Sequence, residues 1–118
     1  MTEKRIPAEV FCLAELLSDE IIARGWTTDD VAARMGGSVE DCARNLLAIN
    51  LIMCVHDDKL LIGDRLFADL TEVFGVDPMF FRNIDAAWRE NPKQRRPFTA
   101  PEEIFGPASR RALIRAVE

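Results

Sequence analysis

Glycines divide much of this 118-residue chain into short segments whose apolar residues recur at helical spacing. The clearest segment runs from about Cys12 to Arg24, where Leu13, Leu17 and Ile21 repeat every four residues. Gly25 follows at the position where a left-handed glycine commonly ends a helix. This pattern predicts an all-α fold that begins with an amphipathic helix.

Two further helices joined by a glycine turn are predicted next. Thr27 and Asp30 have the spacing of a capping box at the start of a helix of about two turns. Gly36-Gly37 supplies a tight turn, and Ser38 caps the third helix. Two short helices around a glycine turn are the signature of the helix-turn-helix. The apolar residues that we expect on the inner face of the third helix are Val39, Cys42, Leu46 and Leu47.

Two more helices are predicted before residue 89. Gly63-Asp64 opens the fourth helix, and Gly75 closes it. Asp77 caps the fifth, with Pro78 at the first helical position, where its missing N–H has no intrahelical partner to lose. The residues expected to reach the core from the fifth helix are Phe80, Phe81, Ile84 and Trp88.

Residues 51–62, between the third and fourth predicted helices, fit two interpretations. Leu51 to Val55 and Leu60 to Ile62 flank a polar break, as two strands flank a hairpin turn. The same residues fit a helical continuation followed by a loop, which we favour. We assign the apolar run to the core, with a dimer interface as the alternative.

The charge balance changes near residue 88. Through Trp88 the chain has 8 Lys/Arg against 16 Asp/Glu, a net charge of −8, and residues 89–118 have 7 against 4, a net charge of +3. We therefore predict a helix-turn-helix domain over residues 1–88, and a basic linker with a short C-terminal helix over residues 89–118. In that helix, from Pro107 to Val117, the residues expected to face inward are Leu113, Ile114 and Val117, and those expected to face outward are Arg110, Arg111 and Arg115.

The sequence contains few residue patterns that indicate catalysis, metal binding or disulfide formation. The three cysteines are widely spaced and include no C-x-x-C pair, which favours free structural thiols over a disulfide framework or a zinc site. The single histidine, His56, lies in the polar break. No Gly-rich phosphate loop or catalytic triad pattern occurs. We expect no enzyme activity, no cofactor and no metal site.

Targeting signals are also missing from the sequence. The longest apolar stretch is far shorter than the ~20 residues that a membrane-spanning helix needs. The first seven residues contain no apolar signal core. We therefore expect a cytoplasmic protein that does not bind membranes.

Three blocks of sequence occur in a characteristic order: Pro7 to Phe11, Ala23 to Gly36 with its Arg-Gly-Trp-Thr junction, and Leu66 to Ile84 with a Gly-x-x-Pro-x-Phe-Phe-x-Asn segment. Together they cover roughly residues 7–88. They resemble the Xre-type helix-turn-helix regulators, in particular HigA-type antitoxins and their phage-encoded relatives. The resemblance implies a five-helix transcriptional regulator that binds operator DNA, often as a homodimer. In the antitoxin branch it also implies a toxin partner that cleaves messenger RNA.

In DNA-binding members of this fold, the head of the second motif helix reaches base edges in the major groove. The residues predicted at the DNA are Thr27, Thr28, Ser38, Val39, Glu40, Asp41, Ala43 and Arg44. Arg44, Thr28 and Ser38 are expected to contact the backbone or bases, and Val39 a thymine methyl group. Auxiliary phosphate contacts from the basic linker are predicted for Lys93, Arg95 and Arg96.

The residues predicted to contact DNA form a surface that we call the predicted reading surface. Its charge supports a second class of function. Glu40 and Asp41 place carboxylates where phosphates would approach, within an acidic domain. The same two residues suit the first turn of a helix, where carboxylates offset the helix dipole. The alternative hypothesis is an acidic, phage-type protein-interaction module that keeps the helix-turn-helix fold and occupies a partner's basic surface.

Overall fold

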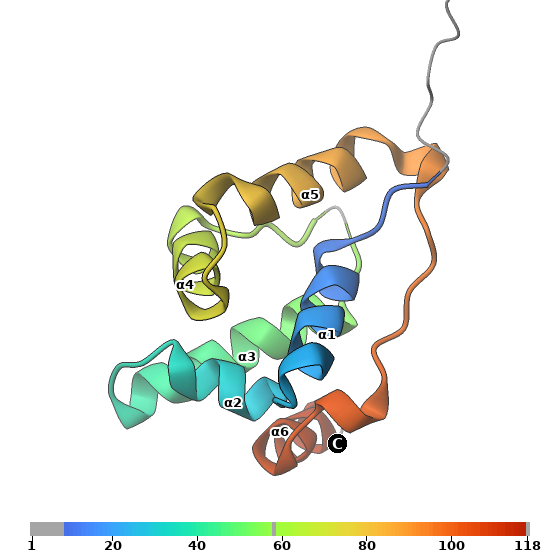
Figure 1. Ribbon diagram of the computed structural model, residues 1–118. Helices are drawn as coiled ribbons and strands as arrows, with labels where there is room; N and C mark the ends of the chain where they lie inside the picture. Colours follow the sequence, from blue (N-terminus) through green and yellow to red (C-terminus); the bar gives the residue numbers. More distant parts are fainter. Residues whose placement is uncertain (1–8, 58, 118) are drawn as a thin grey trace, which may run out of the picture.

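Helices form the framework of the protein in the computed structural model, which describes residues 9–57 and 59–117, with side chains up to residue 114 (Figure 1). In chain order the α-helices are α1 (Leu13–Arg24), α2 (Thr28–Arg34), α3 (Val39–Cys54), α4 (Asp64–Phe74), α5 (Pro78–Glu90) and α6 (Pro107–Val117). Two short 3-10 helices, η1 (Pro92–Gln94) and η2 (Glu102–Ile104), lie between α5 and α6. The described residues contain no strand, so the predicted all-α class is confirmed.

The helices begin and end at the capping residues that were predicted from the sequence. Gly25 ends α1 at a φ of 68°, and Gly75 ends α4 at a φ of 67°. Thr27 at the start of α2 and Ser38 at the start of α3 each form a reciprocal capping box with the aspartate three residues later. Asp77 accepts a hydrogen bond from the amide of Met79 and caps α5.

One apolar cluster holds these helices together. Leu17, Met53, Leu70 and Phe81 are each at most 1% exposed and come from four different helices. Complete burial of such a side chain contributes about 1.5–3 kcal/mol relative to exposure. The cluster therefore fixes α1, α3, α4 and α5 around a common centre.

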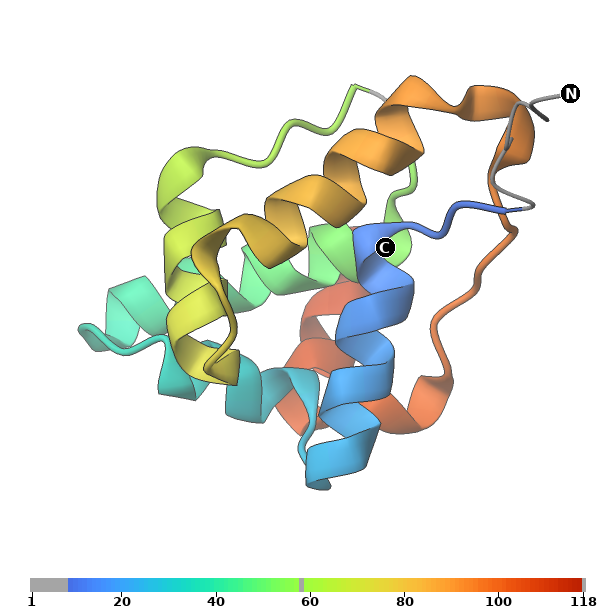
Figure 2. The same ribbon diagram turned by 45° about the horizontal axis from the view of Figure 1, so that its top comes forward.

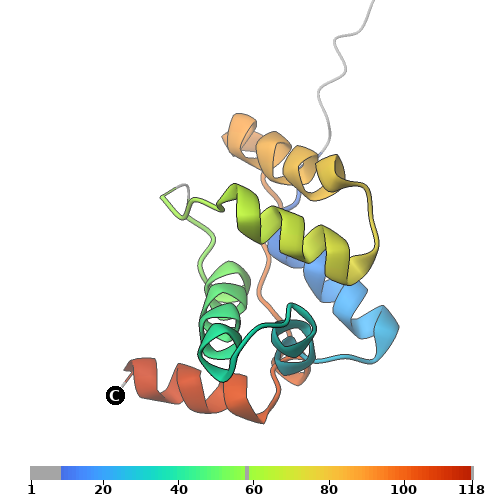
Figure 3. The ribbon, with the colours of Figure 1, turned by 90° about the vertical axis from the view of Figure 1, so that its left-hand side faces the viewer.

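The C-terminal segment packs on this core as well. Backbone hydrogen bonds of 2.8 Å join Val10 to both Gln94 and Arg96, which aligns the chain after α5 with the residues before α1. Ile104 is 1% exposed and belongs to the same buried cluster. The following helix, α6, contacts both α2 and α3 (Figures 2 and 3). Residues far from α2 and α3 in the sequence thus cover part of both helices.

The structure decides the interpretation of residues 51–62. Helix α3 continues to Cys54 and is followed by a loop, which confirms the helical interpretation over the hairpin. The inner face of α3 is formed by Ile49, Ile52 and Met53.

In the apolar run of residues 51–62, which was assigned to the core, Leu51, Val55 and Leu61 are exposed by 40%, 38% and 80%. Four further residues that were predicted to face the core are also exposed. Their exposed fractions are 88% for Val39, 58% for Leu47, 41% for Phe80 and 56% for Ile114. Leu47 lies two residues before the buried Ile49 and therefore on the opposite side of α3. Val39 is in the first turn of α3, and this end of the helix projects past the neighbouring helices (Figure 1). Phe80 lies in the first turn of α5, and the adjacent Phe81 fills the core position. The predicted burial of Val117 concerns a side chain outside the described residues.

Candidate interaction surface on α3

Most of the predicted DNA-contacting residues gather around the start of α3. Ser38, Glu40, Ala43 and Arg44 are exposed there, together with Val39, and Asp41 is half-buried. Thr27, at the start of α2, is also half-buried. The end of α3 that carries these residues projects from the body of the molecule at the left of Figure 1. It is therefore accessible to a large partner.

Thr28 is the exception in this group, because its side chain is 0% exposed. Its hydroxyl lies 2.5 Å from that of Ser109, in the first turns of α6. The structure thus corrects the expected exposure of Thr28. In this arrangement α6 covers the position on α2 from which a phosphate contact was predicted.

Hydrogen bonds hold Asp41 in place at the head of α3. Its carboxylate accepts a hydrogen bond from the Ser38 amide at 3.0 Å and another from the Arg44 guanidinium at 3.1 Å. The backbone and side-chain hydrogen bonds with Ser38, followed by the positive charges of Arg44 and Arg65, lower the pKa of Asp41. Asp41 is therefore a firmly ionised cap, and with Glu40 it makes the head of α3 acidic.

An apolar ridge runs along the outer side of α3. It consists of Val39, Ala43, Leu47 and Leu51, which recur every four residues, and we call it the α3 outer ridge. Val39, Leu47 and Leu51 are 88%, 58% and 40% exposed. Continuous exposed apolar surface on a small domain marks an interaction site. DNA-reading surfaces are instead polar and positively charged.

The three basic linker residues lie elsewhere. Lys93 and Arg96 are exposed near η1, whereas the Arg95 guanidinium stacks on the Trp88 ring at 3.7 Å and donates to the Trp88 carbonyl at 2.9 Å. Arg95 therefore joins the chain after α5 to α5 itself. This region and the head of α3 lie at opposite ends of the molecule (Figure 1). The structure does not bring the linker residues together with the predicted reading surface.

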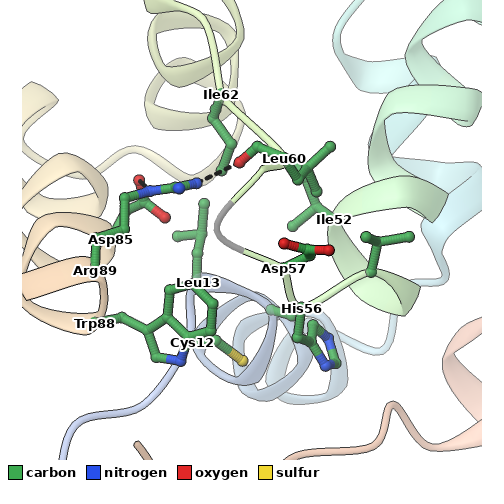
Figure 4. Close-up of a pocket in the computed structure, with 12 residues that line it drawn as sticks. Cys12, Leu13, Ile52, His56, Asp57, Leu60, Ile62, Asp85, Trp88 and Arg89 are labelled. Carbon is green, nitrogen blue, oxygen red and sulfur yellow. Dashed lines mark hydrogen bonds and ion pairs between the residues drawn. The ribbon is translucent and has the colours of Figure 1, made fainter. Parts of the chain in front are cut away.

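A small cavity lies between α1, α5 and the loop after α3 (Figure 4). Its volume of about 30 Å³ is close to that of one water molecule. Burial raises the pKa of the Cys12 thiol at its wall, so this thiol stays protonated and weakly nucleophilic. His56 is also at the wall, with Nε2 3.0 Å from the Met53 carbonyl oxygen. This cavity is therefore too small to hold a substrate or a cofactor.

Sequence reasoning missed one polar contact of this region. The carboxylate of Asp29 accepts hydrogen bonds from the amides of Ala108 and Ser109, about 80 positions along the chain. In the sequence, Asp29 carries only the signal of an acidic residue in a first helical turn. That pattern explains why Asp29 lies in the first turn of α2, but it does not indicate a contact with α6.

Comparison with known protein families, curated proteins and solved structures found no match to this chain. Among the described residues, no group of three or more His, Cys, Asp or Glu side chains is placed to hold a metal ion. None of the described helices combines the length and apolarity needed to cross a membrane.

Proposed function

We propose that this protein is an acidic protein-interaction module, built on a helix-turn-helix arrangement of α1 to α3, that binds a partner's basic surface through the α3 outer ridge. The observation that carries this proposal is the exposed apolar ridge beside an acidic helix head. Covering the exposed parts of Val39, Leu47 and Leu51 is worth roughly 3–6 kcal/mol before the costs of association. Such a surface is suited to a partner that brings apolar anchors.

The charge of the module defines the partner further. Residues 1–88 carry a net charge of −8, and Glu40 lies directly beside the ridge. Opposite charges speed the encounter of two proteins and select against partners of the same sign. We therefore propose a partner whose surface combines basic residues with a few exposed apolar ones.

A specific observation also favours a second candidate, a DNA-binding transcriptional regulator of the HigA-like antitoxin type. Ser38 and Arg44 are exposed at the head of α3, and Gly36 and Gly37, at φ values of 81° and 98°, form the tight turn before it. A homodimer with this arrangement would present two such heads to operator DNA and would bind a toxin elsewhere. Glu40 and Asp41 weigh against this candidate because they would repel phosphates.

Paired variants of the full chain distinguish the two candidates. If the ridge binds a protein, a partner that co-purifies with the wild-type chain should also bind that chain directly after the partner has been purified on its own. Leu47→Asp and the double variant Glu40→Lys, Asp41→Lys then abolish this binding, whereas Arg44→Ala leaves it nearly intact. If the chain binds operator DNA, Arg44→Ala weakens binding to DNA from its own promoter region, and that binding declines steeply with salt. Salt-sensitive binding to this DNA that Arg44→Ala weakens would overturn the proposed protein-binding function.

A further inference from the structure

The chain between η1 and η2 borders a hollow on the surface of the molecule. Residues 96–101 run there without helical structure (Figure 1). The hollow lies between residues 95–99 of this segment and an inner wall formed by Cys12, His56 and Trp88. Its volume of about 370 Å³ is within the range of about 300–1,000 Å³ that is usual for small-molecule sites.

The inner wall of the hollow is also one wall of the small cavity in Figure 4, where Cys12, His56 and Trp88 are labelled. The hollow also adjoins a second one of about 310 Å³, which shares His56, Phe98 and Thr99 with it. The two hollows follow the segment from η1 toward η2. A ligand larger than a single ring therefore has space to extend.

Aromatic side chains form much of the surface of the hollow. The rings of His56 and Phe98 lie with their centroids 5.6 Å apart and an interplanar angle of 54°. Trp88 is 6% exposed, and the Arg95 guanidinium stacks on its ring. Aromatic rings attract one another in edge-to-face and offset-stacked geometries. A flat aromatic ring is therefore the ligand shape that these side chains favour.

The charge of the hollow differs from that of the chain as a whole. Arg95 and Arg96 line it and none of the described residues that line it is acidic, although the chain carries a net charge of −5. The Arg96 side chain is 55% exposed, and its contact with Glu15 at 3.4 Å neutralises only part of its charge. Its guanidinium has five N–H donors in a geometry that suits a carboxylate.

The thiol at the inner wall adds no charge of its own. Burial raises the pKa of Cys12, so the thiol is neutral at neutral pH. The positive charge at the edge of the hollow is therefore not offset by a thiolate beneath it.

We propose that this hollow binds a small molecule with a flat aromatic ring and a carboxylate, the ring against Phe98 and Trp88 and the carboxylate on Arg96. The hollow borders the region after α5, at the opposite end of the molecule from the head of α3 (Figure 1). It is a second site, and the inference does not depend on the proposed function of the α3 outer ridge.

The test titrates the full chain with benzoate and with benzamide, which share an aromatic ring and differ in charge. Binding is followed by proton–nitrogen NMR correlation spectra, in which the indole N–H of Trp88 reports on the hollow. The other tryptophan, Trp26, packs on Phe74 and is the internal reference. A Trp26→Phe variant assigns the two indole signals.

In the wild type we expect saturable shifts of the Trp88 indole signal and of the Phe98 and Thr99 amides. Benzoate should bind at least threefold more tightly than benzamide. Arg96→Gln should weaken benzoate binding at least threefold and leave benzamide binding unchanged. Arg111→Gln removes the same charge from the exposed face of α6 and should leave both affinities unchanged.

A second pair of variants tests the aromatic contact. Phe98→Ala should weaken the binding of both probes at least threefold, because it removes an aromatic wall of the hollow. Phe80→Ala removes a 41% exposed ring that does not line the hollow and should leave both affinities unchanged.

Several results would each overturn the inference. The first two concern the wild type and do not depend on how any variant folds: no saturable shift of the Trp88 indole with benzoate, or equal affinity for benzoate and benzamide. The others are unchanged benzoate binding in Arg96→Gln or in Phe98→Ala, and a loss in either control as large as in its partner variant. None of these measurements involves the α3 outer ridge, so their failure leaves the proposed function intact.

Discussion

Removing the Asp29 carboxylate should weaken the docking of α6 without unfolding the rest of the protein. The carboxylate accepts three hydrogen bonds from the first turn of α6. Loss of an N-cap costs ~0.5–2 kcal/mol, and a hydrogen bond to a charged group contributes ~1.5–3 kcal/mol. Because these contributions overlap and Thr28 still contacts Ser109, we expect Asp29→Ala to weaken docking of α6 by roughly 2–3 kcal/mol.

Native-state amide hydrogen exchange measures this local effect. A change of roughly 2–3 kcal/mol corresponds to roughly 30- to 150-fold faster exchange of the amides of residues 108–110. The matched control is Asp30→Ala, which removes the neighbouring carboxylate. Asp30 bonds to Thr27 in the capping box of α2, so exchange in α6 should change less than threefold. Unchanged exchange at residues 108–110 in Asp29→Ala, or equal acceleration in every helix, would refute this reasoning.

Three further predictions concern the core, the helix cap and the thiols. Leu70→Ala, at a completely buried position, should lower the free energy of unfolding by about 2–5 kcal/mol in urea titrations. Leu61→Ala, at an 80% exposed position, should change it little. The stabilisation from ionised Asp41 is present above its ordinary pKa of 3.8 and is lost as the pH falls through the lowered value, so Asp41→Asn should flatten this part of the acid-unfolding curve. A thiol reagent at neutral pH should label exposed Cys54 before buried Cys12, as mass spectrometry of timed samples would show.

The contrary results are equally specific. Equal destabilisation by Leu70→Ala and Leu61→Ala would show that the described burial does not determine stability. An acid-unfolding curve unchanged by Asp41→Asn would mean that the Ser38 hydrogen bonds do not hold the carboxylate. Labelling of Cys12 as fast as Cys54 would place Cys12 at the surface.

The helix boundaries could be predicted because their determinants are local. A glycine such as Gly25 accommodates positive φ, and Ser38 and Asp77 reach amides two or three residues ahead of them. These interactions need no knowledge of the tertiary structure. The continuation of α3 to Cys54 was favoured on the same basis, from its helical periodicity.

The packed side of α3 could not be fixed from the sequence, because apolar residues occur around most of this helix. Val39 and Leu47 have helical spacing, as do Ile49 and Met53, and only contacts with other helices decide which pair is buried. The same limit applies to the Asp29 contact with Ser109, which spans 80 positions of sequence. Three residues that were placed wrongly in the core, Val39, Leu47 and Leu51, now form most of the α3 outer ridge.

Photo-crosslinking from the α3 outer ridge tests the central proposal most directly. A photoreactive residue at position 47, on the ridge, is compared with one at position 61, which is also exposed and lies off the ridge, in full-length protein inside cells. The proposal predicts a single adduct at position 47, to a protein with a basic surface, and no such adduct at position 61. Adducts to nucleic acid at position 47, or the same protein adducts at both positions, would contradict it.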